Sequence, residues 1–318
     1  MSPRATIVVP TRDNAAVVEE TVRSVLADGS ALERELVVVD NGSRDDTGER
    51  VERLAAGAPF PVRLVREPEP GSSPARNAGV AAAQGELILF VDDDVLVADG
   101  WADALAAPFS DPAVGLVGGR ILPLWPAEPE PWLNGPHSTR LTLHDFGPDD
   151  RALAPDELPV TANLGVRASL LAGLEHPFPL ALGNHGPRSF GQEDYHLVRL
   201  VRATHEVRYA AGAVVHHRIS RERMTLHWMR GTFFDMGVGL ARSEREERAP
   251  RPSLPRRAVR AVRVCAGVRR RRRANDRRER LGPETWEELS GCMWAGKHVE
   301  MLLGRYPRLR DLVRGAFV

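Results

Sequence analysis

The feature that most constrains the fold is a set of short β-branched and aliphatic runs that alternate with helical patterns through the first 120 residues. The runs occupy residues 6–9, 36–39, 62–65 and 86–91. None shows a regular alternation of apolar and polar residues, which indicates strands buried on both faces. Helical patterns follow, for example at 17–26 and, with proline in the first turn, at 74–83. Strands separated by helices predict an α/β fold with a parallel sheet covered on both faces.

Composition agrees with a folded chain. Of the 318 residues, 42% are hydrophobic and 27% are charged, a balance that is atypical of disorder. This length favours one large domain or two unequal ones. The two cysteines, Cys265 and Cys292, stand far apart and form no CxxC pair. We therefore expect neither a disulfide framework nor a thiolate zinc site, and a reducing compartment fits best.

The first ten residues lack the apolar stretch of a secretory signal, and no window approaches the ~20 apolar residues of a membrane span. We therefore expect a cytoplasmic protein. Its charge is balanced overall, with 43 basic and 43 acidic residues, but residues 251–280 hold thirteen arginines against Asp276 and Glu279. GC-rich coding sequence also produces an arginine excess, so this basic segment does not by itself identify a partner.

Polar residues gather where the predicted strands end, at 10–13, 40–43 and 92–94. In doubly wound sheets, ligands bind beyond the carboxyl ends of the strands. The three consecutive acids Asp92, Asp93 and Asp94 follow a buried strand, and carboxylates bind the hard divalent cations that neutralise diphosphates. A solvated acidic turn is the alternative interpretation.

Two later sites carry groups suited to acid–base or metal chemistry. Glu193 and Asp194 open a helical segment, so Asp194 would act either as a helix cap or as a general base whose pKa the helix N-terminus keeps low. His216 and His217 follow an apolar run and face opposite ways on a strand, so at most one addresses a given site. Taken alone, each histidine is better explained as an ordinary buried or surface residue.

Five motifs in sequence order resemble the family 2 glycosyltransferases of GT-A fold. They are Val-Pro-Thr-Arg-Asp at 9–13, Val-Asp-Asn-Gly-Ser at 39–43, Ala-Arg-Asn-Ala-Gly at 75–79, Phe-Val-Asp-Asp-Asp at 90–94 and Gly-Gln-Glu-Asp at 191–194. The resemblance covers roughly residues 4–245, with further similarity at 118–120, 161–167 and 215–223. The five motifs together are far more specific than any one of them.

The resemblance implies a GT-A type, mostly parallel, Rossmann-like sheet flanked by helices. Residues 1–245 would form the glycosyltransferase domain, with a nucleotide-sugar-binding half at 1–120 and an acceptor and catalytic half at 121–245. Residues 246–318 lie outside the resemblance, and we expect them to form a basic, mainly helical extension. The long Pro- and Trp-containing stretch at 123–159 is expected to be a surface loop.

The activity implied by the resemblance is metal-dependent transfer of a sugar from a nucleotide donor, with inversion at the anomeric carbon. A UDP-sugar is the favoured donor. Asp94 and His217 would hold Mn²⁺ or Mg²⁺, and Asp194 would be the base. The donor contacts would be Pro10, Thr11, Asp13, Asp40, Ser43, Arg76, Asp92 and Asp93, although the family motif leaves the position of Asp93 variable.

The acceptor would be a hydroxyl of a glycan, a lipid-linked molecule or a natural product, with Asn163, Trp132 and Glu193 as expected contacts. For two of them a structural alternative stays open. Trp132 would equally anchor the loop to the core, and Asn163 would equally satisfy the local backbone.

Two other functions compete with this interpretation. A sugar nucleotidylyltransferase would need a glycine-rich, lysine-containing loop after the first strand, and residues 10–16 contain neither residue type. A non-catalytic protein would bind a nucleotide sugar without transferring it, or would use the arginines at 269–273 to bind an anionic surface. Nucleic acid is not expected, because the run lacks interleaved aromatic residues. Peripheral contact of residues 251–280 with acidic lipid at the inner face of the membrane is the more economical use, with a solvated helix face as the alternative.

Overall fold

The computed structural model describes residues 4–134, 136–184, 191–246, 254–276, 284–303 and 306–315. The chain forms two compact units. Unit 1 comprises Met1–Leu124, Thr142–Leu180 and Glu193–Arg218, and unit 2 comprises Trp125–Leu141, Ala181–Gln192 and Ile219–Val318.

Unit 1 is built on one mixed sheet. Its strands are β1 Ala5–Thr11, β2 Arg34–Asp40, β3 Val62–Arg66, β4 Leu87–Val91, β5 Val95–Val97, β6 Val114–Leu124, β7 Arg151–Ala152, β8 Asn163–Arg167 and β9 Glu206–Arg218. Their order is β3-β2-β1-β4-β8-β6-β9-β5, and β7 pairs with β9. Strands β3, β2, β1 and β4 are parallel, and β6 is parallel to β9. Strand β8 runs antiparallel between β4 and β6, so the sheet is mixed, with a parallel part formed by β3, β2, β1 and β4.

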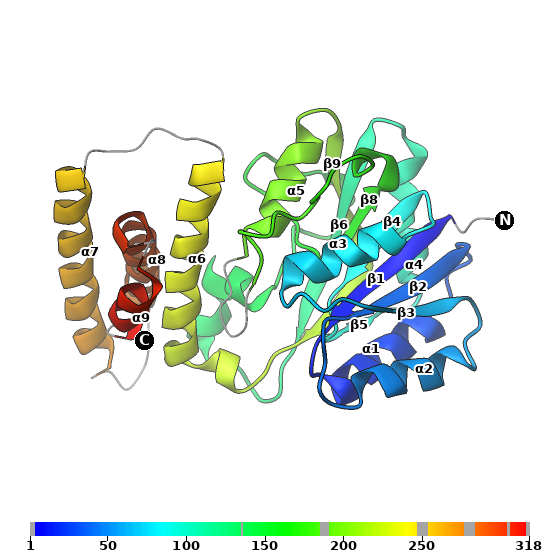
Figure 1. The fold of residues 1–318 in the computed structure, drawn as a ribbon, viewed down its shortest axis with the longest axis horizontal. Helices are drawn as coiled ribbons and strands as arrows, with labels where there is room; N and C mark the ends of the chain where they lie inside the picture. Colours follow the sequence, from blue (N-terminus) through cyan, green and yellow to red (C-terminus); the bar gives the residue numbers. More distant parts are fainter. Residues whose placement is uncertain are drawn as a thin grey trace. The chain divides into compact units, whose positions relative to one another are not determined.

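Helices cover both faces of this sheet (Figure 1). Helices α1 Ala15–Ala27, α2 Thr47–Ala55 and α4 Trp101–Ala106 pack on one face, where Ile7 and Val9 contact apolar side chains of α1. Helices α3 Ser72–Ala82 and α5 Glu193–Arg202 pack on the other face, around Val8. Because successive residues of β1 point to opposite faces, both faces need apolar side chains, which explains the unbroken run at 6–9.

Residues 207–210 and 213–215 are parts of one strand, β9, whose register against β6 shifts between Gly119 and Arg120. One prediction about the segment before β8 needs correction. Residues 123–159 are not simply a surface loop. They contain the end of β6, the 3₁₀ helices η2 Pro131–Asn134 and η3 Pro136–Leu141, and β7. The side chains of Trp132, Leu133 and Leu141 are buried, so apolar contacts fix part of this segment.

Unit 2 is mainly helical. It contains η5 Glu222–Met224, α6 Leu226–Glu246, α7 Leu254–Asn275, α8 Glu284–Leu303 and α9 Pro307–Gly315. Helices α6 and α8 cross closely, because a Cβ at Gly237 or Gly296 would overlap the backbone of the other helix. Buried ion pairs join Arg230 to Glu288 at 2.6 Å and Arg310 to Glu300 at 2.9 Å. The helical extension is confirmed, and the compact units group α6 with it rather than dividing the chain at residue 245.

None of the helices in the described part of the chain is both long and apolar enough to cross a bilayer.

Candidate active site

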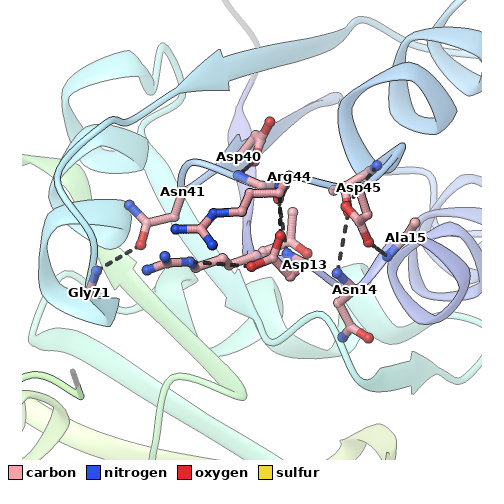
Figure 2. A network of polar contacts seen from close by, with 12 residues as sticks. Asp13, Asn14, Ala15, Asp40, Asn41, Arg44, Asp45 and Gly71 are labelled. Atoms are coloured by element: carbon pink, nitrogen blue, oxygen red, sulfur yellow. Dashed lines mark hydrogen bonds and ion pairs between the residues drawn. The ribbon is translucent and has the colours of Figure 1, made fainter. Parts of the chain in front are cut away.

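The loops that follow β1 and β2 lie side by side at the carboxyl edge of the sheet (Figure 2). The amide of Asn41 donates to Thr11 O at 2.9 Å, which continues the strand pairing into the loops. Asp13 adopts a left-handed backbone conformation, with φ of 48°. Its carboxylate accepts from the amide of Arg44 at 2.7 Å, and its own amide donates to Ser43 Oγ at 3.0 Å. Asp13 and Ser43, both predicted donor contacts, therefore tie the two loops together.

Side chains also connect these loops to their neighbours. Asp40 Oδ1 accepts from the amide of Ser43 at 2.8 Å, and Asn41 Oδ1 accepts from the amide of Gly71 at 2.8 Å (Figure 2). Asp45 Oδ2 accepts from the amide of Ala15 at 3.1 Å. Asn41 and Asp45 were not among the predicted site residues, although both occupy typical turn positions. The edge of the sheet is thus a hydrogen-bonded frame in which the side chain of Asp13 stays 46% exposed.

The three acids that follow β4 point to three different partners. Asp92 Oδ1 accepts from Arg76 Nη2 at 3.0 Å, Asp93 Oδ2 accepts from Thr11 Oγ1 at 2.7 Å, and Asp94 Oδ2 lies 3.2 Å from His217 Nε2. The turn therefore separates the three carboxylates instead of presenting a single acidic surface.

Asp93 turns inward. Burial, and then the charge of the neighbouring Asp94, raises the pKa of Asp93 to about 7 against the opposing hydrogen bond from Thr11. The buried Thr21 on α1 donates towards the carbonyl oxygens of residues 93 and 95, at 2.8 and 2.7 Å. Thr21 was not among the predicted site residues. The feature of the sequence that could have indicated it is a hydroxyl group on the apolar face of a predicted helix. Asp93 and Thr21 together fix the backbone that carries Asp94.

Arg76 joins the donor side of the site to the start of α5. Its guanidinium is buried and donates from Nη2 to Asp92 and from Nη1 to Glu193 Oε1, both at 3.0 Å. Ser72 Oγ, a contact that was not predicted, donates to the same Glu193 oxygen at 2.8 Å. The charges of Asp194, Asp92 and Glu193 raise the pKa of Arg76 despite its burial. Arg76, which was predicted to contact the nucleoside, therefore holds two carboxylates in place.

Asp194 lies in the first turn of α5, and its Oδ1 accepts from Thr161 Oγ1 at 2.9 Å. Burial raises the pKa of Asp194 to about 6, although the positive charge of Arg76 and the hydrogen bond from Thr161 act in the opposite direction. The expectation that the helix N-terminus would keep this pKa low is therefore wrong. Removal from water outweighs the helix dipole at this position.

The predicted metal ligand and the predicted base belong to one cluster. Burial raises the pKa of Asp92, and the charges of both Asp94 and Asp194 add to this effect. We call the following residues of unit 1 the acidic cluster: Arg76, Asp92, Asp94, Glu193, Asp194 and His217. Residues from α3, the end of β4, α5 and β9 thus meet although they are up to 141 positions apart, a separation that follows from residue numbers 76 and 217.

Two of the predicted acceptor contacts have structural roles instead. Asn163 is fully buried, and its Nδ2 donates to Arg120 O at 3.0 Å and to Ala213 O at 2.7 Å. Its Oδ1 accepts from Trp101 Nε1 at 2.9 Å, so the side chain is saturated within the core. Trp132 belongs to unit 2, where it is buried and donates from Nε1 to Glu130 at 3.0 Å. These contacts support the structural alternative for both residues.

The pair Asp94–His217 offers a carboxylate and an imidazole from adjacent backbone segments, a donor set that suits Mn²⁺. His217 is buried and His216 only partly so, which agrees with the opposite facing of neighbouring strand residues. Among the described residues, no group of three or more His, Cys, Asp or Glu side chains is arranged to hold a metal ion. A cation held by Asp94 and His217 would take two protein ligands, and the rest of its shell would come from other oxygens.

The family model described as glycosyl transferase family 2 matches residues 6–151. A pre-mycofactocin glycosyltransferase of Mycobacterium tuberculosis is 33% identical over 125 residues, which cover 37% of this chain and 24% of that protein. An N-acetylglucosaminyltransferase of Azorhizobium caulinodans is 25% identical over 256 residues, covering 76% of this chain and 62% of that protein. The chain spans less than two thirds of the length of these curated relatives, and only 13% of a protein of Sinorhizobium fredii.

Solved structures share the fold. A mannosyltransferase from Pyrobaculum calidifontis, determined with GDP-Man and Mn²⁺, has a TM-score of 0.55 at 19% identity, covering 99% of this chain and 80% of that one. The structure of GalNAc-T7 with UDP, GalNAc and Mn²⁺ has a TM-score of 0.52 at 16% identity, covering 70% of this chain and 44% of that one.

Proposed function

Because this chain contains a family 2 glycosyltransferase domain of GT-A fold, we propose that the protein transfers a sugar from a nucleotide-sugar donor to a hydroxyl group, with inversion at the anomeric carbon. The observation that carries this proposal is the acidic cluster, which gathers a candidate base, a candidate cation site and a buried arginine at one place in unit 1. A transfer reaction needs a group that accepts the proton of the acceptor hydroxyl and a group that neutralises the leaving diphosphate.

The donor nucleoside is proposed to bind at the frame formed by the loops after β1 and β2. Pro10, Thr11, Asp13, Asp40 and Ser43 lie there, at the carboxyl ends of parallel strands. The two solved neighbours contain GDP-Man and UDP, which supports a nucleoside diphosphate in this position. A UDP-sugar is our favoured donor.

The diphosphate would lie towards Asp92 and Asp94. Asp94 and His217 are proposed to hold Mn²⁺ or Mg²⁺, and the Mn²⁺ in both neighbours supports a divalent cation. Such a cation, when bound, would supply positive charge to the departing diphosphate. Asp92 is bonded to Arg76 instead, so its proposed role is to fix that guanidinium beside the donor.

Asp194 is the proposed base. The acceptor oxygen would form a bond to the anomeric carbon while the bond from that carbon to the phosphate oxygen breaks, and the hydroxyl proton would pass to a carboxylate oxygen of Asp194. With a pKa of about 6, Asp194 is ionised at neutral pH yet more basic than an ordinary aspartate. Attack opposite the leaving group inverts the sugar carbon without a covalent enzyme intermediate.

Glu193 remains our proposed contact on the acceptor side. Its Oε1 is held by Arg76 and Ser72, while its buried Oε2 has no hydrogen-bond partner among the described residues. This oxygen would accept a hydrogen bond from the acceptor. The acceptor class is a hydroxyl-bearing glycan, lipid-linked molecule or natural product, and the relatives include a pre-mycofactocin glycosyltransferase and an N-acetylglucosaminyltransferase.

A ligand screen followed by one substitution tests this proposal. UDP-, dTDP- and GDP-sugars are screened with Mn²⁺ by thermal shift, because a ligand that binds the folded state raises its stability. With the donor that binds, Asp194→Asn is expected to abolish transfer while nucleotide binding persists. Asp46→Asn, which removes an exposed acid at the start of α2, serves as the matched control and should remain active. Full transfer by Asp194→Asn would refute the base assignment, and the absence of any nucleotide-sugar binding would refute the proposed function.

A further inference from the structure

The C-terminal helices of unit 2 expose large apolar side chains in a region that is also rich in arginine. Nine large apolar side chains are exposed in the described part of the chain, and six of them lie in α7, α8, α9 or the residue before α9: Val262, Trp286, Trp294, Tyr306, Leu309 and Leu312. Val262 is 69% exposed and Leu312 is 77% exposed. Exposed apolar side chains that are concentrated in one region are typical of an interaction site.

Helix α7 carries an unusual charge. Its sequence, Leu254–Asn275, contains nine arginines and no acidic residue. Among the side chains that the structure describes, Arg263, Arg269 and Arg270 are exposed. Arg271 pairs with Glu287 of α8 at 3.2 Å, an exposed pair that leaves the helix strongly positive. This field would attract an anionic partner over roughly 8 Å at physiological salt.

The arginines and the tryptophans meet at a groove between α7 and α8. This groove has a volume of about 360 Å³. Helix α7 contributes Arg263, Gly267 and Arg271, which are four residues apart and therefore lie along one stripe. Helix α8 contributes Trp286, Ser290 and Trp294 with the same spacing, and its two indoles are 39% and 45% exposed.

Two glycines leave the space that forms the bottom of this groove. Gly267 and Gly291 both line it, and a Cβ at Gly291 would lie 2.7 Å from Val268 Cγ2. The two helices can therefore approach while their long side chains stand at the rims. The result is a surface with guanidinium groups on one side and half-exposed indole rings on the other.

We propose that this α7–α8 surface docks on a lipid bilayer that contains anionic headgroups. Guanidinium groups bind phosphate through paired hydrogen bonds, and indole rings favour the boundary between headgroups and hydrocarbon. A bilayer surface offers both environments side by side, whereas a nucleic acid offers phosphate without an apolar phase. A symmetric contact between two copies through this groove would bring Arg263 and Arg271 of both copies together, which like-charge repulsion disfavours.

Vesicle binding of the full chain tests the electrostatic part. The probes are vesicles of phosphatidylcholine alone and of phosphatidylcholine with about one third phosphatidylglycerol. The protein is expected to sediment with the anionic vesicles only, and added salt should release it. Arg263→Ser with Arg270→Ser should lower the partition coefficient about thirtyfold, since each basic residue near the surface contributes roughly a factor of five. Arg23→Ser with Arg53→Ser removes two exposed arginines from unit 1 and should leave binding unchanged.

A second measurement tests the position of the tryptophans. Bromine-labelled lipid is expected to quench part of the tryptophan fluorescence, and Trp286→Phe with Trp294→Phe should remove that quenching while retaining an aromatic ring at each position. Equal binding to neutral and anionic vesicles, or no binding to either, would overturn the proposal. So would salt-sensitive binding of an oligonucleotide without vesicle binding, or a doubling of the solution mass that the Arg263 and Arg270 substitutions abolish. Neither assay requires transfer activity, so this proposal and the proposed function fail independently.

Discussion

Replacing Asp194 by asparagine should stabilise the protein at neutral pH while it abolishes transfer. Burial raises the pKa of Asp194 from 3.8 to about 6, so the folded state disfavours the ionised form. A shift of about two units corresponds to roughly 3 kcal/mol in the free energy of unfolding once the group is ionised. Asparagine has the same shape, can still accept from Thr161, and carries no charge that burial would penalise.

The sign of the effect sets its pH window. Because the folded-state pKa lies above the unfolded value, the contribution of Asp194 to stability is fully present below about pH 3.8 and is lost as pH rises through about 6. The stability of Asp194→Asn relative to the parent should therefore grow across this window and stay constant above it. At neutral pH we expect a rise in Tm of roughly 5 to 10 °C for a gain of this size.

Thermal unfolding of both proteins between about pH 4 and pH 8 measures this difference, with Asp46→Asn as the control for loss of an exposed acid. Arg76 keeps its bonds to Asp92 and Glu193 in the variant, so no buried cation is left unpaired. An Asp194→Asn protein that is no more stable than the parent at neutral pH, or a difference that does not change with pH, would refute the argument from burial.

Substitutions at three further positions test separate parts of the structure. Arg76→Met removes a positive charge that lowers the pKa of Asp194, so the acidic limb of the kcat/KM profile should move to higher pH, while Arg76→Lys should move it less. Asp94→Asn should raise the Mn²⁺ concentration needed for half-maximal activity by at least tenfold, as expected for loss of a charged ligand, with little change in Tm. Gly296→Ala places a methyl group against the backbone of α6 and should lower the free energy of unfolding by about 1 to 3 kcal/mol, measured by urea denaturation.

Much of the fold could be predicted because one physical rule determines it. A strand covered by helices on both faces needs apolar side chains on both, and β1, β2 and β4 carry that pattern in the sequence itself. The positions of the polar loops follow, since the carboxyl ends of parallel strands meet at one edge. The register of β9 was not predictable in this way, because its shift depends on pairing with a strand far away in the sequence. The paired residues Arg120 and Val214 are 94 positions apart.

The residues of the candidate site could be predicted from the sequence, but their pKa values and hydrogen-bond partners could not. Motif order identified Asp94, Asp194 and His217, which the fold does bring into one cluster. The pKa of Asp194 was misjudged because helix position is a local property, whereas burial depends on packing of segments distant in sequence. The sequence left two roles open for Asn163 for the same reason, since its hydrogen-bond partner Trp101 lies 62 residues away.

The charges of the acidic cluster determine how binding of a donor and binding of a cation would affect each other. Four carboxylates, those of Asp92, Asp94, Glu193 and Asp194, share a region of low solvent exposure in which Arg76 is the buried guanidinium that bridges two of them. Burial already disfavours the ionised forms of Asp92 and Asp194, and a donor diphosphate would add further negative charge. A donor diphosphate would therefore bind more favourably at neutral pH together with a compensating positive charge, which a cation at the proposed Asp94–His217 site would supply. In the proposed reaction we therefore expect binding of the donor and binding of the cation to favour each other.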